Sequence, residues 1–474
     1  MREVQIDKIS LERLAGLLDP DRAAMLMSRA EQAKGLLDGR VVWNVNATAS
    51  GGGVAEMLTT LLAYSRGAEV DARWLVLDGT PEFFRITKRL HNLLHGSTGD
   101  GGGMGDAERE VYDAVLADNV DALQSQVKEG DIVLLHDPQT TGLVEPLQAV
   151  GAHVIWRCHI GRDTTTEETD LGWRFLKPYL DKADAVIFSR AAYVPEWVDR
   201  DKLRLIPPSL DPFSAKNVEL REVDVASALS HANLVDIPNH QGSLEFERRD
   251  GTTGQVRSHE HLFAAGDVIP GDARVVMQVS RWDRLKDMSG VLEGFVDNLS
   301  RFPDDVHLAL VGPEVSGVSD DPEGAEVLDE CVHLWGNLPE DQQARVHLIA
   351  VPMDDVDENA HLVNALQHHA TVVVQKSIVE GFGLTVTEPM WKGKPVVASK
   401  VGGIQDQIID GVSGLLLADP HDLDGFADLL VKVLEDDELG HRLGLEARER
   451  VREMFLGDRH LIQYVQLFEQ LLGL

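Results

Sequence analysis

Two carboxylates flank a glycine turn in the second half of the chain. Glu380 comes directly before Gly381-Phe-Gly383, and Glu388 follows after the turn. The apolar run Thr371 to Val374 predicts a buried strand before the turn, and Leu384 to Trp391 has the apolar spacing of a helix after it. A strand, a glycine turn and a helix in this order direct free backbone N–H groups toward a ligand. The two carboxylates suit the hydroxyl groups of a sugar and of a ribose.

Two cations follow another apolar segment. Arg281 and Lys286 come after the strand predicted over Arg274 to Ser280, and Arg284 between them is a weaker candidate. Two cations at a strand end can clamp a pyrophosphate and stabilise the charge that builds up as it leaves. The alternative is a solvated cluster of charges on a loop.

Polar residues also end two apolar segments of the first half. The segment Asp131 to Leu135 runs into His136-Asp-Pro-Gln139, and His153 to Trp156 runs into Arg157-Cys-His159. Open α/β sheets bind ligands at the carboxyl ends of their strands, so these residues are candidates for a substrate site. A histidine after an apolar strand is also often a satisfied core residue, and the residues alone leave this alternative open for His159.

The elements that carry these residues form two successive α/β halves. In the first half, the strand Val41 to Ala47 leads through Ser50-Gly-Gly-Gly53 to a helix over residues 54–64. Three glycines allow a ligand to approach the backbone closely, although a plain tight turn is the alternative. Further strands are expected over residues 72–78, 131–135, 153–156, 185–188 and 203–206 in the first half, and over 274–280, 306–312, 346–351, 371–374 and 414–417 in the second. The stiff segment Pro207 to Pro212 is interpreted as the hinge, because proline cannot continue a strand.

Several segments outside these motifs carry weaker expectations. We expect residues 1–39 to form a helical leader and the glycine-rich loop 96–105 to be mobile. The segment Ser243 to Ser258 alternates around an Asp-Gly turn and predicts a hairpin. His259 and His261 are expected at the surface, and Asp354-Asp355 in a solvated acidic loop.

Composition narrows the class of protein. The 474 residues include 79 Asp and Glu against 44 Lys and Arg, a formal charge of −35 that disfavours nucleic acid and anionic membranes as partners. We interpret this acidity as an aid to solubility or an adaptation to salt. Only two cysteines occur, which is typical of a reducing cytoplasm. No apolar run is long enough for a membrane span, and the N-terminus has no apolar signal core.

The combined pattern Ser377-x-x-Glu380-Gly-Phe-Gly, with Glu388, Gly393-x-Pro395 and Gly402-Gly403, resembles that of retaining glycosyltransferases. Within them, the chain is most similar to the glycosyltransferring trehalose synthases of glycosyltransferase family 4. The likeness extends to Ser50–Glu56, Ala72–Trp74, His136–Gln139, Trp156–Ile160, Pro207–Pro212, Lys216–Leu220 and Gln278–Arg281.

This resemblance implies the GT-B fold, an α/β architecture of two Rossmann-like domains that face each other across a cleft. The first domain, residues 1–212, would bind the acceptor, and the second, residues 213–455, would bind a nucleotide sugar. The C-terminal helix, residues 456–474, would cross back onto the first domain.

The resemblance also implies roles for single residues. Arg281 and Lys286 would hold the diphosphate, Glu380 would orient the sugar hydroxyls, and His159 would contact the sugar near the reacting centre. These four form the expected catalytic set. The donor set is Gly52, Gly53, Arg281, Lys286, Val351, Met353, Glu380, Gly381, Phe382, Gly383, Leu384, Thr385 and Glu388, of which Glu388 would bind the ribose and Val351 and Met353 would border the base. The acceptor set is Asp137, Gln139 and Arg157. No metal and no cofactor are expected.

The expected reaction is reversible transfer of glucose, with retention of configuration, from a nucleoside diphosphate to glucose, yielding trehalose. One alternative is a trehalose phosphorylase, in which inorganic phosphate would occupy the Arg281 and Lys286 site and Glu388 would be idle. Others are transfer to a different sugar acceptor and a noncatalytic sensor of sugar nucleotides. The sequence leaves the base open, and a homodimer is a further expectation. A dinucleotide-dependent oxidoreductase is disfavoured, because the Gly51-Gly52-Gly53 spacing does not match the dinucleotide-binding motif.

Overall fold

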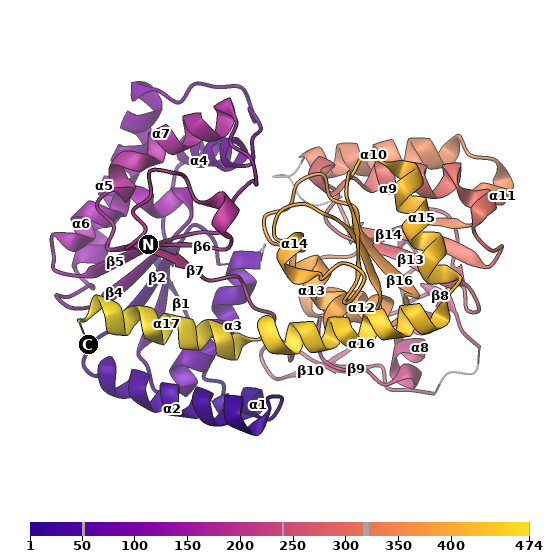
Figure 1. Cartoon of the computed structure of the whole chain (residues 1–474), viewed down its shortest axis with the longest axis horizontal. Helices are drawn as coiled ribbons and strands as arrows, with labels where there is room; N and C mark the ends of the chain where they lie inside the picture. The colour runs from indigo at the N-terminus through magenta and orange to yellow at the C-terminus, as the bar shows by residue number, and fades with distance from the viewer. Residues whose placement is uncertain (50–52, 239–240, 316–321, 474) are drawn as a thin grey trace. The chain divides into compact units, whose positions relative to one another are not determined.

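The computed structural model describes residues 1–49, 53–238, 241–315 and 322–473. The chain divides into two compact units (Figure 1). Unit 1 comprises Met1–Leu210 and Phe455–Leu474, and unit 2 comprises Asp211–Met454.

Unit 1 is built on a seven-stranded sheet in the order β1-β3-β2-β4-β5-β6-β7. All neighbouring strands are parallel except β1 and β3. The strands are β1 Arg2–Val4, β2 Val42–Asn46, β3 Ala72–Val76, β4 Ile132–His136, β5 His153–Cys158, β6 Ala185–Phe188 and β7 Leu203–Leu205. The helices are α1 Leu11–Ala15, α2 Pro20–Leu36, α3 Gly53–Gly67, α4 Pro81–Leu94, α5 Asp106–Gln124, α6 Val144–Gln148, α7 Glu167–Leu180 and α17 Gly457–Leu471, with short 3-10 turns η1 Pro138–Leu143 and η2 Ala191–Tyr193.

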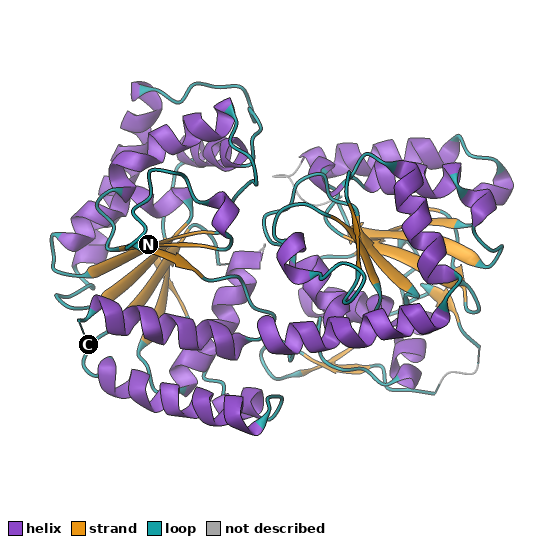
Figure 2. Ribbon diagram, viewed as in Figure 1, coloured by secondary structure: helices purple, strands orange, loops and turns teal. Residues whose placement is uncertain are grey.

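Helices cover both faces of this sheet (Figure 2). Its central strands are therefore buried on both sides and read as continuous apolar runs, as in Ile132–His136. One core packs Leu90 of α4 and Leu176 of α7 against the sheet. The other core packs Leu58 of α3 and Phe468 of α17.

Unit 2 contains a second seven-stranded sheet in the order β11-β15-β14-β13-β16-β17-β18, parallel except for β11. The strands of unit 2 are β8 Val235–Asp236, β9 Glu245–Glu247, β10 Thr253–Gln255, β11 Phe263–Ala265, β12 Ile269–Pro270, β13 Arg274–Val279, β14 Val306–Pro313, β15 Val346–Val351, β16 Val372–Gln375, β17 Val396–Ser399 and β18 Leu415–Leu417. Its helices are α8 Glu222–His231, α9 Met288–Asp297, α10 Pro322–Gly336, α11 Glu340–Gln343, α12 Val356–His369, α13 Leu384–Trp391, α14 Ile404–Gln407, α15 Leu423–Leu434 and α16 Asp437–Met454, with 3-10 turns η3 Arg284–Lys286 and η4 Leu299–Arg301.

The structure corrects one prediction at the N-terminus and adds detail to two others. Residues 1–39 are not helical throughout, because Arg2–Val4 pairs with β3 as an edge strand. The glycine-rich loop 96–105, expected to be mobile, is tied to α4 by the buried guanidinium of Arg89, which binds Asp100 and the carbonyl of Gly103. The hairpin predicted over 243–258 is confirmed, with β9 and β10 paired antiparallel. Among the described helices, none combines the length and apolar character needed to cross a bilayer.

Candidate active site

The glycine turn of unit 2 lies at the carboxyl edge of the second sheet. It follows β16 and leads into α13, as the sequence predicts. Because β16 pairs in parallel with β13, the segments that follow these two strands emerge at the same edge. The amide of Ile378 donates a hydrogen bond to the carbonyl of Leu285, at 2.8 Å, and joins the two segments directly.

Glycine is required at two positions of this turn. Gly383, the N-cap of α13, has a φ of +86°, which other residues rarely adopt. A Cβ on Gly403 would lie 2.6 Å from the Cα of Phe382, so only glycine allows the second glycine pair to pack on the turn. The side chain of Gln407 then fixes the turn by donating to the carbonyls of Phe382, at 2.5 Å, and Gly383, at 3.2 Å. In the described chain no side chain caps the start of α13.

Lys286 and Glu380 form an ion pair beside this turn. The Nζ of Lys286 lies 2.5 Å from Oε2 of Glu380, and both side chains are largely buried. The hydroxyl of Ser377 also approaches this carboxylate, at 3.4 Å. Two members of the predicted catalytic set are thus brought together, as a cation and an anion in contact at the start of a helix.

Arg281 is not drawn into this ion pair. Its side chain is 62% exposed and donates to Asp283 at 3.2 Å. The weaker candidate, Arg284, pairs with Glu326 and Glu330 of α10. The phosphate-binding role of Arg281 therefore stays a prediction.

A buried ion pair involves the residue that follows Lys286, and the sequence does not predict it. Lys376, at the end of β16, is fully buried, and its ammonium binds the carboxylate of Asp287. Asp287 has a φ of +53° and begins α9. Gln278 accepts a hydrogen bond from the amide of Lys376, at 2.9 Å, and donates to the carbonyl of Lys286, at 2.7 Å. The main chain that carries Lys286 is thereby fixed on both sides.

Glu388 lies further along α13 among lysines. Its carboxylate is buried and sits 3.4 Å from Nζ of Lys216. Nζ of Lys392 lies 3.3 Å from the Oδ1 of Asn217 and from the main-chain oxygen of Glu388. Burial lowers the pKa of Lys392 to about 7. Lys216 lies in one of the segments that carry the family resemblance, but nothing in the sequence indicates that it contacts Glu388.

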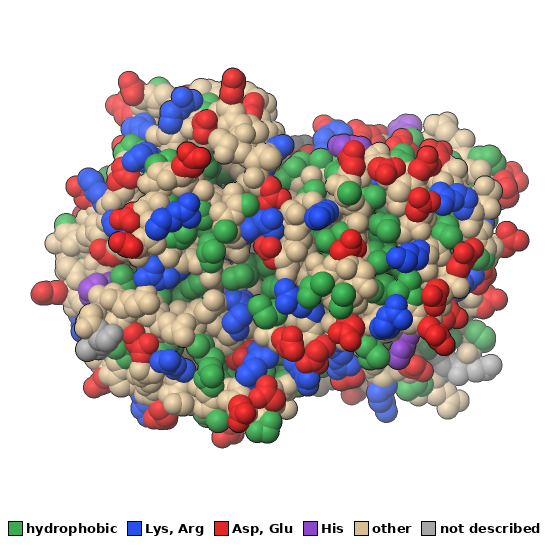
Figure 3. Space-filling model, in the orientation of Figure 1, with side chains coloured by type: hydrophobic (Ala, Val, Ile, Leu, Met, Phe, Trp, Pro, Cys, Tyr) green, Lys and Arg blue, Asp and Glu red, His purple; other side chains and the backbone are tan. Residues whose placement is uncertain are grey.

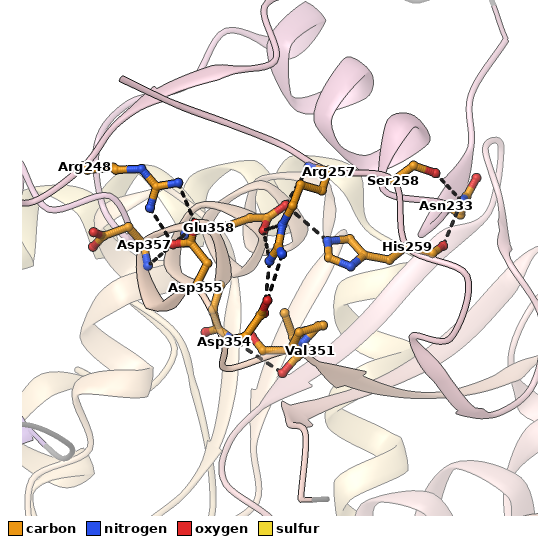
Figure 4. Close-up of polar contacts among 12 residues, drawn as sticks. Asn233, Arg248, Arg257, Ser258, His259, Val351, Asp354, Asp355, Asp357 and Glu358 are labelled. Atoms are coloured by element: carbon orange, nitrogen blue, oxygen red, sulfur yellow. Dashed lines mark hydrogen bonds and ion pairs between the residues drawn. The ribbon is translucent and has the colours of Figure 1, made fainter. Parts of the chain in front are cut away.

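The loop after β15 is exposed in part and carries ion pairs that the sequence does not predict (Figure 4). Val351 is buried and Met353 is 43% exposed. Asp354 is exposed, as expected of a solvated loop, but it pairs with Arg257, whereas Asp355 is only 19% exposed and pairs with Arg248.

The two histidines near this loop differ from each other. His259, predicted at the surface, is only 13% exposed at its side chain and bonds Glu358 at 3.1 Å. His261 is exposed, as expected.

In unit 1, Asp137 and His159 meet at the ends of β4 and β5. The amide of His159 donates to Oδ1 of Asp137 at 2.8 Å, and Asp137 has a φ of +63°. Nε2 of His136 lies 3.0 Å from Oδ1 of Asn44, and Nδ1 of His136 lies 3.0 Å from Nε2 of His159. Since the amide oxygen of Asn44 can only accept, Nε2 of His136 carries the proton, and His159 donates from its own Nε2.

Burial sets the protonation of this cluster. It raises the pKa of Asp137 to about 7, although the His159 amide opposes the rise. It lowers the pKa of His136 to about 3 and the pKa of His159 well below its usual value. Neutral imidazoles beside a carboxyl group that titrates near neutrality can exchange hydrogen bonds with sugar hydroxyls.

Arg157, predicted to bind the acceptor, contacts residues of unit 1, and its role in acceptor binding stays a prediction. It is fully buried, and its guanidinium contacts His460 at 2.6 Å, the hydroxyl of Tyr464, and the carbonyl of Ile206 at 3.0 Å. Because these groups belong to α17 and to the segment after β7, Arg157 holds the C-terminal helix on the sheet.

The remaining predicted residues of unit 1 differ in placement. Gln139 is partly buried in η1, and Gly53 begins α3. Gly52 lies outside the described residues.

The part of the chain that the structure describes contains no group of three or more His, Cys, Asp or Glu residues able to hold a metal ion. The expectation of a metal-independent reaction stays a prediction.

Comparisons with known proteins match both units. Residues 44–195 match the profile of the trehalose synthase N-terminal domain, and residues 263–450 match that of the glycosyl transferases group 1. The chain is 33% identical to a trehalose synthase of Pyrococcus horikoshii, over 100% of this chain and 99% of that protein. It is 34% identical to a trehalose synthase of Rubrobacter xylanophilus, over 94% of each. A solved sucrose-phosphate synthase from Thermosynechococcus elongatus superimposes with a TM-score of 0.62 at 21% identity, covering 92% of this chain and 99% of that one. The fold is therefore GT-B.

Proposed function

This chain belongs to the trehalose synthase family of group 1 glycosyltransferases, and we propose that it transfers glucose reversibly from a nucleoside diphosphate glucose to glucose, forming trehalose. The observation that carries the proposal is the Lys286–Glu380 ion pair at the start of α13. A cation, a carboxylate and the first amides of a helix are the groups that a sugar diphosphate requires.

Each group has a defined task in the proposed reaction. Lys286, together with Arg281, stabilises the negative charge on the departing diphosphate. Glu380 accepts hydrogen bonds from the hydroxyls of the transferred glucose, and Glu388 accepts them from the ribose. Lys286 has three N–H donors, so a phosphate oxygen can bind it while Glu380 keeps its contact.

The bond changes balance without an enzyme nucleophile. The bond from C1 of glucose to the phosphate oxygen breaks, the bond from C1 to the acceptor oxygen forms on the same face, and the acceptor proton moves to the leaving phosphate. Asp137 is a poor nucleophile in this scheme, because its raised pKa keeps it partly protonated near neutral pH. It suits a hydrogen bond to an acceptor hydroxyl, which we assign to Asp137 and Gln139. His159 is assigned to the transferred sugar.

One assay tests the proposal against its main alternative. The protein is incubated with glucose and, in turn, with ADP-, UDP- and GDP-glucose, and the disaccharide is identified by NMR. We expect α,α-1,1-linked trehalose with at least one donor and unchanged yield in EDTA. Release of glucose 1-phosphate from trehalose and inorganic phosphate, without nucleotide, would establish a phosphorylase instead. No product with any donor or acceptor would overturn the transferase.

Variants of the turn after β13 test the phosphate assignment. Lys286→Ala and Arg281→Ala should each lower kcat by about 100-fold to 1,000-fold, the range seen when one group that stabilises developing charge is lost. Arg284→Ala is the matched control from the same turn, since its side chain is bound to α10, and it should keep near wild-type activity. Full activity of Arg281→Ala would show that this residue does not bind the diphosphate.

We also propose a cytoplasmic, metal-independent enzyme that can form a homodimer. The two cysteines, Cys158 and Cys331, are both free and buried, which is consistent with a reducing environment.

A further inference from the structure

The confirmed hairpin and the segment that follows it, between β10 and β11, hold the loop at the end of β15. This loop, residues 352–355, connects β15 to α12. Two guanidinium groups from the hairpin region, Arg248 and Arg257, bind its two aspartates (Figure 4). Nothing in the reaction proposed above uses these contacts.

Arg248 fixes the helix end of the loop. Its two terminal nitrogens donate to the two oxygens of Asp355, at 2.7 and 2.5 Å, a bidentate geometry that restricts orientation as well as distance. Asp355 is also the N-cap of α12 and accepts hydrogen bonds from the amides of Asp357, at 3.2 Å, and Glu358, at 3.1 Å. One carboxylate therefore joins the hairpin, the loop and the helix.

Arg257 fixes the middle of the loop and bridges it to the helix. It donates to both oxygens of Asp354, at 2.8 and 3.0 Å, and its Nε donates to Glu358 at 2.5 Å. Glu358 is almost fully buried. Its carboxylate also accepts a hydrogen bond from the Arg257 amide, at 2.6 Å, and lies 3.1 Å from Nε2 of His259. A buried carboxylate with this many donors is held in one position, since losing a donor would leave its charge uncompensated.

Apolar contacts support the same arrangement. Phe246 of β9 is buried and stacks on His361 of α12, with ring centroids 4.9 Å apart. The guanidinium of Arg248 lies over the ring of Phe246 at 5.3 Å.

Asn233 holds the segment that carries Arg257. Its side-chain amide donates to Ser258, at 3.1 Å, and to the carbonyl of His259, at 2.8 Å.

These contacts hold the loop, and part of it remains exposed. Asn359 donates to the carbonyl of Pro352 at 2.9 Å, whereas the side chain of Met353 remains 43% exposed. Val351 and Met353 are the residues we expect to border the base of the donor. The contacts of the two arginines therefore set the position of the main chain that would meet the base.

We propose that Arg248 and Arg257 are positioning residues that fix the loop 352–355 and thereby set the selectivity of the enzyme for the nucleotide base. This inference rests on the proposed nucleotide-sugar donor. Neither arginine contacts the donor; each acts through Asp354, Asp355 and Glu358.

The test uses Arg257→Gln, Arg248→Gln and the conservative Arg257→Lys in the full-length protein. Initial rates with ADP-, UDP- and GDP-glucose give kcat and KM for each donor and KM for glucose. Calorimetry with ADP, UDP and GDP gives the three dissociation constants without turnover.

We expect both glutamine variants to raise the KM of the preferred donor by about tenfold, which is within the loss that small misplacements cause. The ratio of kcat/KM between preferred and poorest donor should fall, kcat and the KM for glucose should change less than about twofold, and Arg257→Lys should recover part of the selectivity. Arg249→Gln is the matched control, because Arg249 pairs the same hairpin with Asp357 of α12, at 2.7 Å, but does not touch the loop. It should leave base selectivity unchanged.

Two results would overturn the inference. One is base selectivity equal to wild type in both glutamine variants, in kinetics and in calorimetry, whether or not their melting temperatures fall. The other is a wild-type protein that binds no nucleoside diphosphate. A protein that binds nucleotides selectively but transfers no glucose would refute the proposed reaction and leave the calorimetric arm to decide the inference.

Discussion

At the scale of single residues, the end of β4 and the end of β5 place groups with opposed protonation preferences side by side. Burial favours the neutral forms of Asp137, His136 and His159. Low pH therefore favours the neutral form of the carboxyl group, whereas high pH favours the neutral form of the imidazoles. Of these three groups, Asp137 is the one with a pKa, about 7, in the range where an enzyme is normally assayed.

This raised pKa predicts a pH-dependent stability. The carboxyl pKa is 3.8 in the unfolded chain and about 7 in the folded one, so the folded state binds more protons between these values. The contribution of Asp137 to stability is complete below pH 4 and is lost as the pH rises through 7. Asp137→Asn removes this titration, and its free energy of unfolding should improve relative to wild type by up to about 3 kcal/mol between pH 5 and pH 8.

Urea unfolding at several pH values measures this difference. The titrations of His136 and His159 are shared by both proteins and largely cancel. Asp100→Asn is the control, because Arg89 lowers the pKa of Asp100 to about 2, outside the tested range. It should shift the stability by a constant amount, and parallel curves for Asp137→Asn and wild type would refute the prediction.

At the scale of elements, the sequence predicts single helices and strands well, but it does not predict which of them lie next to each other. The helix Leu384–Trp391 has the predicted bounds, because apolar spacing and glycines act within a few residues. The pairing of Lys376 with Asp287 depends on β16 lying beside β13, which periodicity does not report. For the same reason the sequence does not predict the contacts of Arg157, since its partners on α17 are about 300 positions away in the chain. The strand Arg2–Val4 is too short to show a period of two.

Breaking the Lys376–Asp287 pair should destabilise the protein more than breaking an exposed ion pair. Lys376→Met leaves a mostly buried aspartate without its cation, at the point where β13 passes into α9. We expect a loss of about 3 kcal/mol in the free energy of unfolding. The kcat should fall as well, because Asp287 directly follows Lys286 in the chain.

The matched comparison is Lys177→Met, which breaks the exposed Lys177–Asp181 pair of α7 and should cost less than about 1 kcal/mol. The double variant Lys376→Met with Asp287→Asn should recover part of the stability, since it removes the unpaired charge and asparagine tolerates the positive φ. Equal losses for the two lysine variants in chemical denaturation would contradict this account.

At the scale of the whole molecule, each unit has its own sheet and its own apolar cores, and the chain carries far more acid than base. Figure 3 shows Asp and Glu side chains spread over the visible face of both units, with Lys and Arg among them. The cations of the candidate site, such as Lys286, therefore belong to a protein with a net charge of −35. A diphosphate donor has to be held by these few cations despite the overall field.

This excess of charge predicts that salt stabilises the protein. Repulsion among exposed carboxylates acts over the Debye length, which falls to about 3 Å at 1 M salt, whereas buried pairs such as Lys376–Asp287 are screened much less. The melting temperature should therefore rise by about 5 °C between 0.05 and 1 M KCl, which corresponds to roughly 1 to 2 kcal/mol for a domain of this size. Differential scanning calorimetry measures the shift, and sucrose at matched osmolality, which is excluded from the protein surface without screening charge, serves as the control. If KCl raises the melting temperature no more than sucrose does, or lowers it, the exposed ion pairs outweigh the repulsion and the acidic surface is not a source of instability.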